Sequence, residues 1–169
     1  MKAIQINHKM KSIKKLMYAL LFMVSISGYG QFNDKGYKDL NVGMSYLEAE
    51  KIIPIDLVED DTVMVNYDNI ELELNFAYDS NGNYYLYIIR CTHKDVKLEG
   101  VSQKVMGKTL SEVKAVLGDK LAPYEDGGPE SRYRIYYKDS AAKANYESSC
   151  VLVFDQSGVL TSILTSYNP

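Results

Sequence analysis

The side chains that could carry chemistry in this chain are mainly carboxylates, and two of them lie two positions apart in a strand-like segment. Glu71 and Glu73 alternate with apolar residues, so a β-strand would present both on one face, about 7 Å apart. Two carboxyl groups at that separation can act as acid and base in glycoside hydrolysis. The same spacing is also the ordinary solvent-facing half of an amphipathic strand. We adopt this second interpretation and keep a hydrolase as an alternative.

Histidine and cysteine offer little further chemistry. His8 lies in the N-terminal segment, which leaves His93 as the only histidine in the rest of the chain. A serine or cysteine nucleophile needs a neighbouring base, and a catalytic zinc usually takes several histidine or cysteine ligands. Cys91 and Cys150 are the only cysteines, and the strand registers predicted below place them on opposite sheet faces. A disulfide and two separately buried thiols both stay open.

An acidic stretch gives the remaining candidate for a metal site. Asp56 and residues 59–61 supply four carboxylates, and calcium prefers such oxygen ligands. A solvated acidic loop explains the same residues. We therefore predict no metal, no cofactor, no catalytic residue and no enzymatic activity.

The N-terminal segment predicts export. Residues 1–15 carry five lysines and no acid, residues 16–26 are almost wholly apolar, and small residues precede Gln31. This order is typical of a secretory signal, and the apolar stretch is shorter than the roughly 20 residues of a membrane-spanning helix. We expect residues 1–30 to be a signal peptide and the protein to be periplasmic or secreted. No cysteine lies directly after the apolar stretch, where a lipid would be attached, so we predict no stable membrane anchor.

The charge balance of the remaining chain argues against nucleic acid. The chain holds 19 Lys and Arg, five of them in the N-terminal segment, against 22 acidic residues. Binding to a phosphate backbone depends on clustered cations, and the only tight basic group is Arg132, Arg134 and Lys138. A solvated strand face accounts for that group.

Two similar segments predict a repeated unit. Residues 43–48 (GMSYLE) return as residues 107–112 (GKTLSE), and each fits a capping box, in which a hydroxyl and a carboxylate satisfy the free amides at a helix start. Apolar residues recur at helical spacing behind each cap. Pro54 and Gly118 are then expected to end the two helices.

Alternating patterns follow each predicted helix. They predict strands at 62–68, 71–78 and 84–91 in the first unit, with a tight turn at 79–83. The second unit repeats this with strands near 132–138, 149–154 and 160–164 and a turn at 155–158. A regular register places Leu74 opposite Ile88, with Cys91 on the outer face. In the second unit it places Leu164 inward and Ile163 outward.

These elements predict an α+β fold of two tandem repeats, each a short helical segment followed by a three-stranded antiparallel sheet, with the helices on one sheet face. The first repeat spans residues 31–98 and the second spans residues 99–169, joined by a polar connector at 92–103. One such unit buries little apolar surface, so the two are expected to share a core as one compact domain.

The tyrosine content suggests what such a sheet is for. The chain has 15 tyrosines and no tryptophan, and tyrosine is enriched in protein interfaces, although it also favours strands generally. The predicted outer face carries tyrosines, with acids in one half and arginines in the other. The predicted partner-binding residues are Tyr85, Tyr87, Tyr136, Glu71, Glu73, Arg132 and Arg134. We predict a non-enzymatic protein-binding or inhibitor-like module whose partner is an envelope or secreted protein.

The repeated segments also resemble a known family. Residues 107–113 (GKTLSEV) followed by 116–118 (VLG) resemble the GMTxxxVxxxLG signature of the SmpA/OmlA (BamE-like) outer-membrane assembly lipoproteins, and residues 43–45 match its opening. Tandem units of this kind are also similar to the β-lactamase-inhibitor-protein (BLIP-like) fold. The resemblance implies two sheets side by side and a bias toward protein partners. The lipid-bearing cysteine of the lipoproteins is absent from this chain, so anchoring is not implied.

A second function class stays open beside protein binding. An envelope-associated protein that binds a small ligand or lipid would need an apolar cavity between sheet and helices.

Overall fold

The computed structural model describes residues 31–56, 61–124, 131–136 and 148–167. Within these ranges the protein is mostly β, with 11 strands in two sheets and two short α-helices. The predicted α+β fold of two helix-plus-three-strand repeats is therefore wrong. The predicted signal peptide, residues 1–30, lies outside the described residues.

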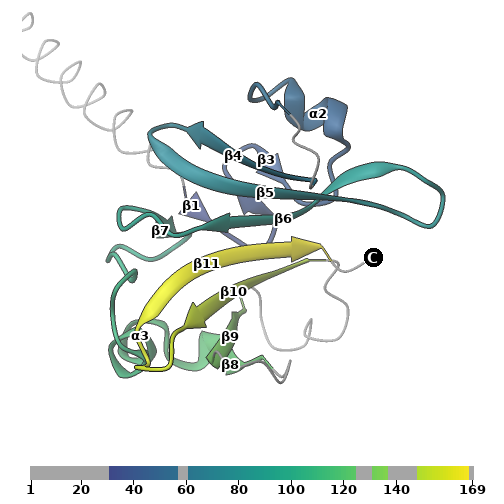
Figure 1. The fold of residues 1–169 in the computed structure, drawn as a ribbon. Helices are drawn as coiled ribbons and strands as arrows, with labels where there is room; N and C mark the ends of the chain where they lie inside the picture. The colour runs from purple at the N-terminus through teal and green to yellow at the C-terminus, as the bar shows by residue number, and fades with distance from the viewer. Residues whose placement is uncertain (1–30, 57–60, 125–130, 137–147, 168–169) are drawn as a thin grey trace, which may run out of the picture.

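The larger sheet has seven strands, and every neighbouring pair is antiparallel. Its order is β4 (Thr62–Tyr67), β5 (Ile70–Tyr78), β6 (Tyr84–Cys91), β11 (Leu160–Tyr167), β10 (Ser148–Phe154), β9 (Ser131–Ile135) and β8 (Leu121–Pro123). Figure 1 shows these strands stacked from β4 at the top to β8 at the bottom. At the centre of this sheet, β6 pairs with β11.

A second sheet of four very short strands lies on one face of the first. Its order is β3 (Leu40–Asn41), β2 (Gly36–Tyr37), β1 (Gln31–Phe32) and β7 (Lys97–Leu98). The Thr165 hydroxyl donates to the Asn33 carbonyl oxygen at 2.7 Å, and a Cβ on Gly36 would lie 2.9 Å from Ile89 Cδ1. Thr165 and Ile89 pair across β11 and β6, so the small sheet covers their side. We call this side the inner face.

The small sheet explains why the predicted repeat fails. Strands of two residues carry too little sequence to show a period, and the segment taken as a polar connector contains β7. Val96 and Leu98 in that segment are fully buried, as are Phe32 and Leu40. The centre of the inner face is therefore covered by strands, where the prediction expected helices.

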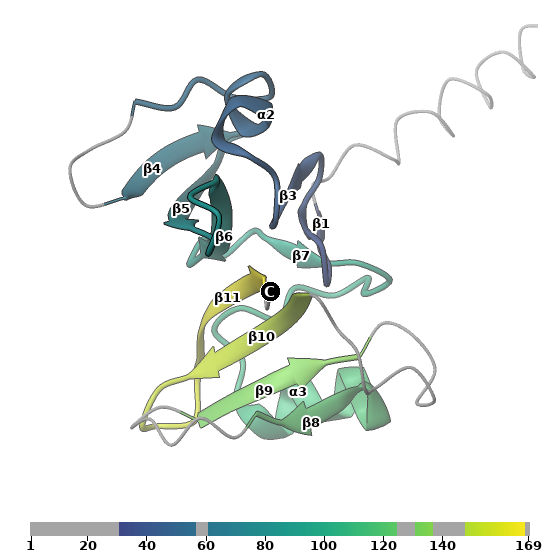
Figure 2. The same cartoon turned by 90° about the vertical axis from the view of Figure 1, so that its right-hand side faces the viewer.

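The helices themselves begin where predicted. α2 (Tyr46–Glu50) and α3 (Leu110–Leu117) each start with a complete capping box, formed by Ser45 with Glu48 and by Thr109 with Glu112. These two predictions are confirmed. α2 ends well before Pro54, and Gly118 is the C-terminal cap of α3, followed by a 3-10 turn, η1 (Gly118–Lys120). Figure 2 shows α2 beside β4 at one end of the molecule and α3 beside β8 and β9 at the other.

The residues just before each helix dock on a strand of the large sheet. The Gly43 amide donates to the Leu86 carbonyl at 2.8 Å, and the Leu86 amide donates to the Met44 carbonyl at 2.7 Å. The Gly107 amide donates to the Leu160 carbonyl at 3.0 Å in the same way, and the Leu160 amide donates to the Lys108 carbonyl at 2.9 Å. Each segment before a helix thus adds backbone hydrogen bonds to one strand of the large sheet. The segment before α2 pairs with β6, and the segment before α3 pairs with β11.

The β5–β6 hairpin contains a bulge that the sequence did not reveal. Phe76 pairs with Leu86 as predicted, but Asn75 pairs with Ile88, which leaves Tyr87 as an extra residue. Because side chains alternate along a strand, one extra residue exchanges the two faces beyond it. Leu74 therefore pairs with Ile89 instead of Ile88.

The β10–β11 hairpin has a bulge of the same kind. Phe154 pairs with Leu160, and Val153 pairs with Ser162, so Thr161 is the extra residue. Leu152 consequently pairs with Ile163, which points inward. The prediction that Ile163 faces outward and Leu164 inward is wrong for this reason.

The bulge in β6 also moves Cys91 to the inner face. Cys91 and Cys150 are both buried in the main core, and neither forms a disulfide. The prediction that they occupy opposite sheet faces is therefore wrong, while the alternative of two separately buried thiols is what the structure shows. Burial raises the pKa of the Cys91 thiol to about 11, which keeps it protonated and unreactive at neutral pH.

Candidate binding face

The face of the large sheet opposite the small sheet is the candidate site, and we call it the outer face. Residues that pair across neighbouring strands point to the same side. One row therefore crosses the outer face from β5 to β9. It consists of Glu73, Arg90, Leu164, Val151 and Arg134.

Arginines are concentrated on this face. The chain contains only three, Arg90, Arg132 and Arg134, against 16 lysines. Arg90 pairs with Leu164, Arg134 with Val151 and Arg132 with Val153, so all three lie on the outer face, each half-buried. The sequence placed Arg132 and Arg134 there but missed Arg90, because the bulge at Tyr87 reverses its predicted side.

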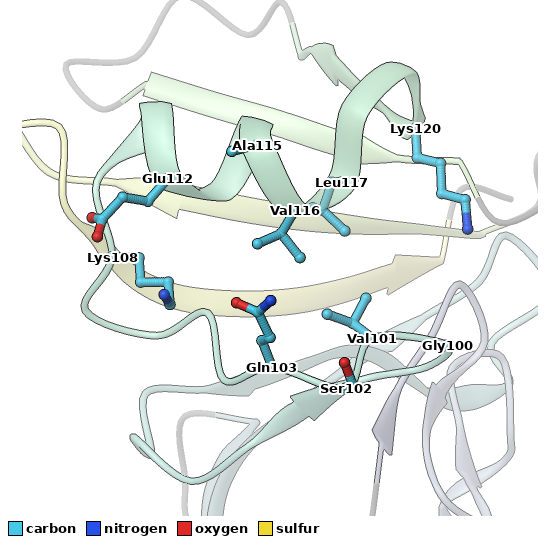
Figure 3. Close-up of a pocket in the computed structure, with 10 residues that line it drawn as sticks. All are labelled: Gly100, Val101, Ser102, Gln103, Lys108, Glu112, Ala115, Val116, Leu117 and Lys120. Carbon is cyan, nitrogen blue, oxygen red and sulfur yellow. The ribbon is translucent and has the colours of Figure 1, made fainter.

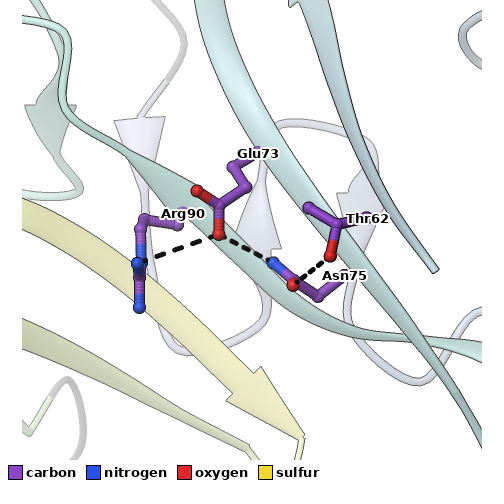
Figure 4. Close-up of polar contacts among 4 residues, drawn as sticks. All are labelled: Thr62, Glu73, Asn75 and Arg90. Carbon is purple, nitrogen blue, oxygen red and sulfur yellow. Dashed lines mark hydrogen bonds and ion pairs between the residues drawn. The ribbon is translucent and has the colours of Figure 1, made fainter. Parts of the chain in front are cut away.

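A chain of polar contacts positions Arg90 (Figure 4). The Thr62 hydroxyl donates to Asn75 Oδ1 at 2.8 Å, and the Asn75 side-chain amide donates to Glu73 Oε1 at 3.0 Å. The same Glu73 oxygen lies 3.8 Å from Arg90 Nη1. Three strands thus hold one carboxylate against one guanidinium. Glu73 is engaged in this way and Glu71 is exposed, so the two acids do not converge on a pocket.

An apolar cluster lies under the other two arginines. Val151, Val153 and Leu164 are buried on the outer face, and Ile88 and Tyr124 pack against them. The Arg134 guanidinium carbon lies 4.7 Å from the centre of the Tyr124 ring. The outer face of this half is therefore a small second core topped by half-exposed Arg and Tyr side chains, and the valines themselves do not form an open patch.

The predicted tyrosines do not gather into one group. Tyr85 and Tyr87 contact each other edge to face, with ring centres 6.4 Å apart, and Tyr85 also contacts Tyr167 at 5.5 Å. Desolvation raises the pKa of Tyr85. Tyr136 follows β9, which β10 and β11 separate from β6, so it lies about 14 Å or more from the other two. We call the part of the outer face on β4, β5 and β6 the polar half, and the part on β8 to β11, which carries Arg132 and Arg134, the arginine half. Tyr85 and Tyr87 belong to the polar half, and Tyr136 belongs to the arginine half.

A separate groove lies beside α3 (Figure 3). Its volume is about 540 Å³, and it runs between residues 100–103 and the helix. Val101, Val116 and Leu117 form its apolar part, while Lys108 and Lys120 lie at its rim. Glu112 also lines it, but hydrogen bonds from the Thr109 amide and hydroxyl lower the pKa of this carboxyl and commit it to the helix cap.

Only part of the acidic stretch lies within the described residues. Glu59 and Asp60 lie outside the described residues, and Asp61 accepts a hydrogen bond from the Tyr84 hydroxyl at 2.5 Å. Desolvation, followed by this hydrogen bond, raises the pKa of Tyr84. Within the described ranges no group of three or more histidine, cysteine or acidic side chains is arranged to hold a metal ion.

In the part of the chain that the structure describes, no helix has the length and apolar character needed to span a membrane. Comparison of the chain with family models, with curated proteins and with solved structures found no match in any of the three. The resemblance to the SmpA/OmlA and BLIP-like proteins accordingly stays a prediction.

Proposed function

We propose that this protein is a non-enzymatic protein-binding module whose contact surface is the outer face of the seven-stranded sheet. One observation carries the proposal. Among the described residues, the inner cluster collects side chains from both helices and the small sheet, whereas the outer cluster contains only residues of the large sheet and Tyr124. The outer face is thus the side of the large sheet on which no described helix or second sheet packs.

The residue types on this face support the proposal. Arginine and tyrosine are the side chains most enriched at protein interfaces and at their energetic hot spots. Here they are held before any partner arrives, Arg90 by the Glu73 contact and Arg134 by the Tyr124 ring. Side chains ordered in advance lose less conformational entropy on binding. Export to the periplasm or the extracellular space stays a prediction. An exported protein would meet its partner in that compartment.

The test is a capture experiment with matched surface variants. We expect wild-type protein, immobilised and exposed to native envelope and secreted fractions, to retain a defined partner that also binds when purified. The double variant Arg90→Gln/Arg134→Gln should lose that partner. The control variant Lys51→Gln/Lys94→Gln removes the same charge from exposed positions on other elements and should retain it.

Thermal unfolding separates binding from folding. If the arginine variant loses the partner while its melting temperature stays close to that of the control, the outer face is the contact surface. Equal capture by wild type and the arginine variant would contradict the proposal.

The groove beside α3 supports a second candidate, an envelope-associated small-ligand or lipid-binding protein. Its volume of about 540 Å³ falls within the range of known ligand sites. Fatty acids should displace an environment-sensitive dye from the groove. Loss of this displacement in Val116→Asp, together with its retention in the control Met64→Asp, would favour this function. The lining of the groove includes two lysines, a glutamate, a glutamine and a serine, so it is the weaker candidate for an apolar ligand.

A further inference from the structure

We infer that the partner presents an acidic protein segment to the outer face, with separated carboxylates bound by Arg90, Arg132 and Arg134. This inference rests on the proposed function and names the chemistry of the partner. The starting observation is that every arginine of the chain lies on one face of one sheet, although lysines are five times as numerous. Arginine differs from lysine in offering a planar fork of donors that matches a carboxylate.

The Arg90 side chain is 39% exposed, and that of Arg134 is half-buried. The Nε atoms of Arg90 and Arg134 are buried and have no hydrogen-bond partner among the described residues. Arg90 reaches Glu73 only at 3.8 Å, longer than a charge-assisted hydrogen bond, and Arg134 lies over an aromatic ring. A buried Nε is out of reach of a partner. A partner carboxylate would instead meet the exposed part of each guanidinium and form charge-assisted hydrogen bonds there.

The spacing of the arginines defines what can fit. Arg132 and Arg134 are two residues apart on β9, so their Cα atoms lie about 7 Å apart, and Arg90 lies three strands from Arg134, about 14 Å away. Val151 and Leu164 lie between them but are buried, so a partner meets no open apolar patch there. A matching partner carries single carboxylates separated by uncharged residues, as an extended acidic peptide segment does.

The charges on the outer face favour an acidic peptide segment over a polyanion such as a nucleic acid. The chain has a net charge of −3, and Glu71 and Glu73 lie at the β5 end of the same face. Nucleic acids and anionic membranes are bound by dense clusters of cations, which three dispersed arginines beside two acids do not form. The acidic end of the face would repel a continuous polyanion, whereas a segment with separated charges can avoid it.

The test uses a defined probe. A fluorescein-labelled octapeptide of alternating Glu and Val is titrated with the full chain, and anisotropy is compared with that of the matched Gln-Val peptide. We expect the Glu-Val peptide to bind about tenfold more tightly. Arg90→Gln/Arg134→Gln should abolish this preference, and Arg90→Lys/Arg134→Lys should reduce it, because lysine keeps the charge but lacks the fork. Lys51→Gln/Lys94→Gln should leave it unchanged.

Several results would overturn the inference. These are equal binding of the two peptides, no measurable binding of the Glu-Val peptide, or an unchanged preference in the arginine-to-glutamine variant that melts like wild type. Tighter binding to phosphatidylglycerol vesicles or to a DNA oligonucleotide than to the peptide would also overturn it. If a captured partner still depends on the outer face while the peptides bind equally, the proposed function stands and only the acidic partner is wrong.

Discussion

The two long hairpins, β5–β6 and β10–β11, are built alike at their turns. Asp79 accepts hydrogen bonds from the amides of Asn81 and Asn83 at 2.8 Å, and Asp155 accepts them from Ser157 and Val159 at 2.9 and 3.0 Å. A glycine with positive φ follows in each loop, at Gly82 and Gly158, where a left-handed residue is required. Each hairpin then bulges by one residue and meets a helix-cap segment.

The outer faces of these hairpins differ sharply. β5 and β6 present the polar contacts of Glu73, Asn75 and Arg90, whereas β10 and β11 bury Val151, Val153 and Leu164. The same local turn chemistry therefore supports one hairpin with a polar outer side and another whose outer side is an apolar cluster beneath Tyr124 and Arg134. The division of the outer face into a polar half and an arginine-topped apolar half follows from this difference.

The largest expected effect comes from placing a charge on the buried outer side. Val153 is 3% exposed and Met64 on the polar half is 55% exposed. Val153→Asp should destabilise the protein by about 4 kcal/mol, because an unpaired carboxylate would enter an apolar cluster. Met64→Asp should cost less than about 0.5 kcal/mol. Urea unfolding followed by circular dichroism measures both losses. Similar losses would contradict the difference between the outer sides of the two hairpins.

Truncation on the inner side should affect the two hairpins equally. Leu74 and Leu152 are both fully buried in the main core, and each is expected to lose about 3 kcal/mol when changed to alanine. The same unfolding experiment compares the two variants. A loss at one site several times that at the other would show that the two hairpins contribute unequally to the core.

The smallest expected effect concerns the turns and depends on pH. Hydrogen bonds from Asn83 lower the pKa of Asp79, and hydrogen bonds from Ser157, followed by Val159, lower that of Asp155 below the ordinary value of 3.8. A carboxyl with a lowered folded-state pKa stabilises the protein above its unfolded pKa, and this contribution is lost as the pH falls further.

Asp79→Ala and Asp155→Ala should each lower the melting temperature at pH 7. The difference from wild type should shrink as the pH falls below about 4. Melting curves between pH 2.5 and pH 7 provide the measurement. A difference that stays constant with pH would mean that the carboxylate charge plays no part in the turn.

Sequence reasoning succeeded here where the signal was local. Ser45 with Glu48 and Thr109 with Glu112 are capping boxes because their side chains act on backbone three residues away, and the Asp–Gly turns carry their own conformational chemistry. The pairs closest to the first turn, such as Phe76 with Leu86, follow directly from that turn.

It failed where structure depends on distant residues. A bulge at Tyr87 or Thr161 leaves no local mark, yet it reverses the side of Arg90 and Leu164. The two-residue strands exist only because residues 31–41 and 97–98 meet on the inner face. These contacts form the small sheet, and because of them the fold is not the predicted repeat. Segments this short carry no periodicity from which the contacts could be predicted.

Arginine footprinting of the captured complex tests the binding face most directly. Phenylglyoxal modifies arginine, and this chain has only three arginines, all on the outer face. We predict that Arg90 and Arg134 react in the free protein and are protected together in the complex, as quantified by mass spectrometry. Arginines that remain as reactive in the complex as in the free protein would contradict a contact surface on the outer face.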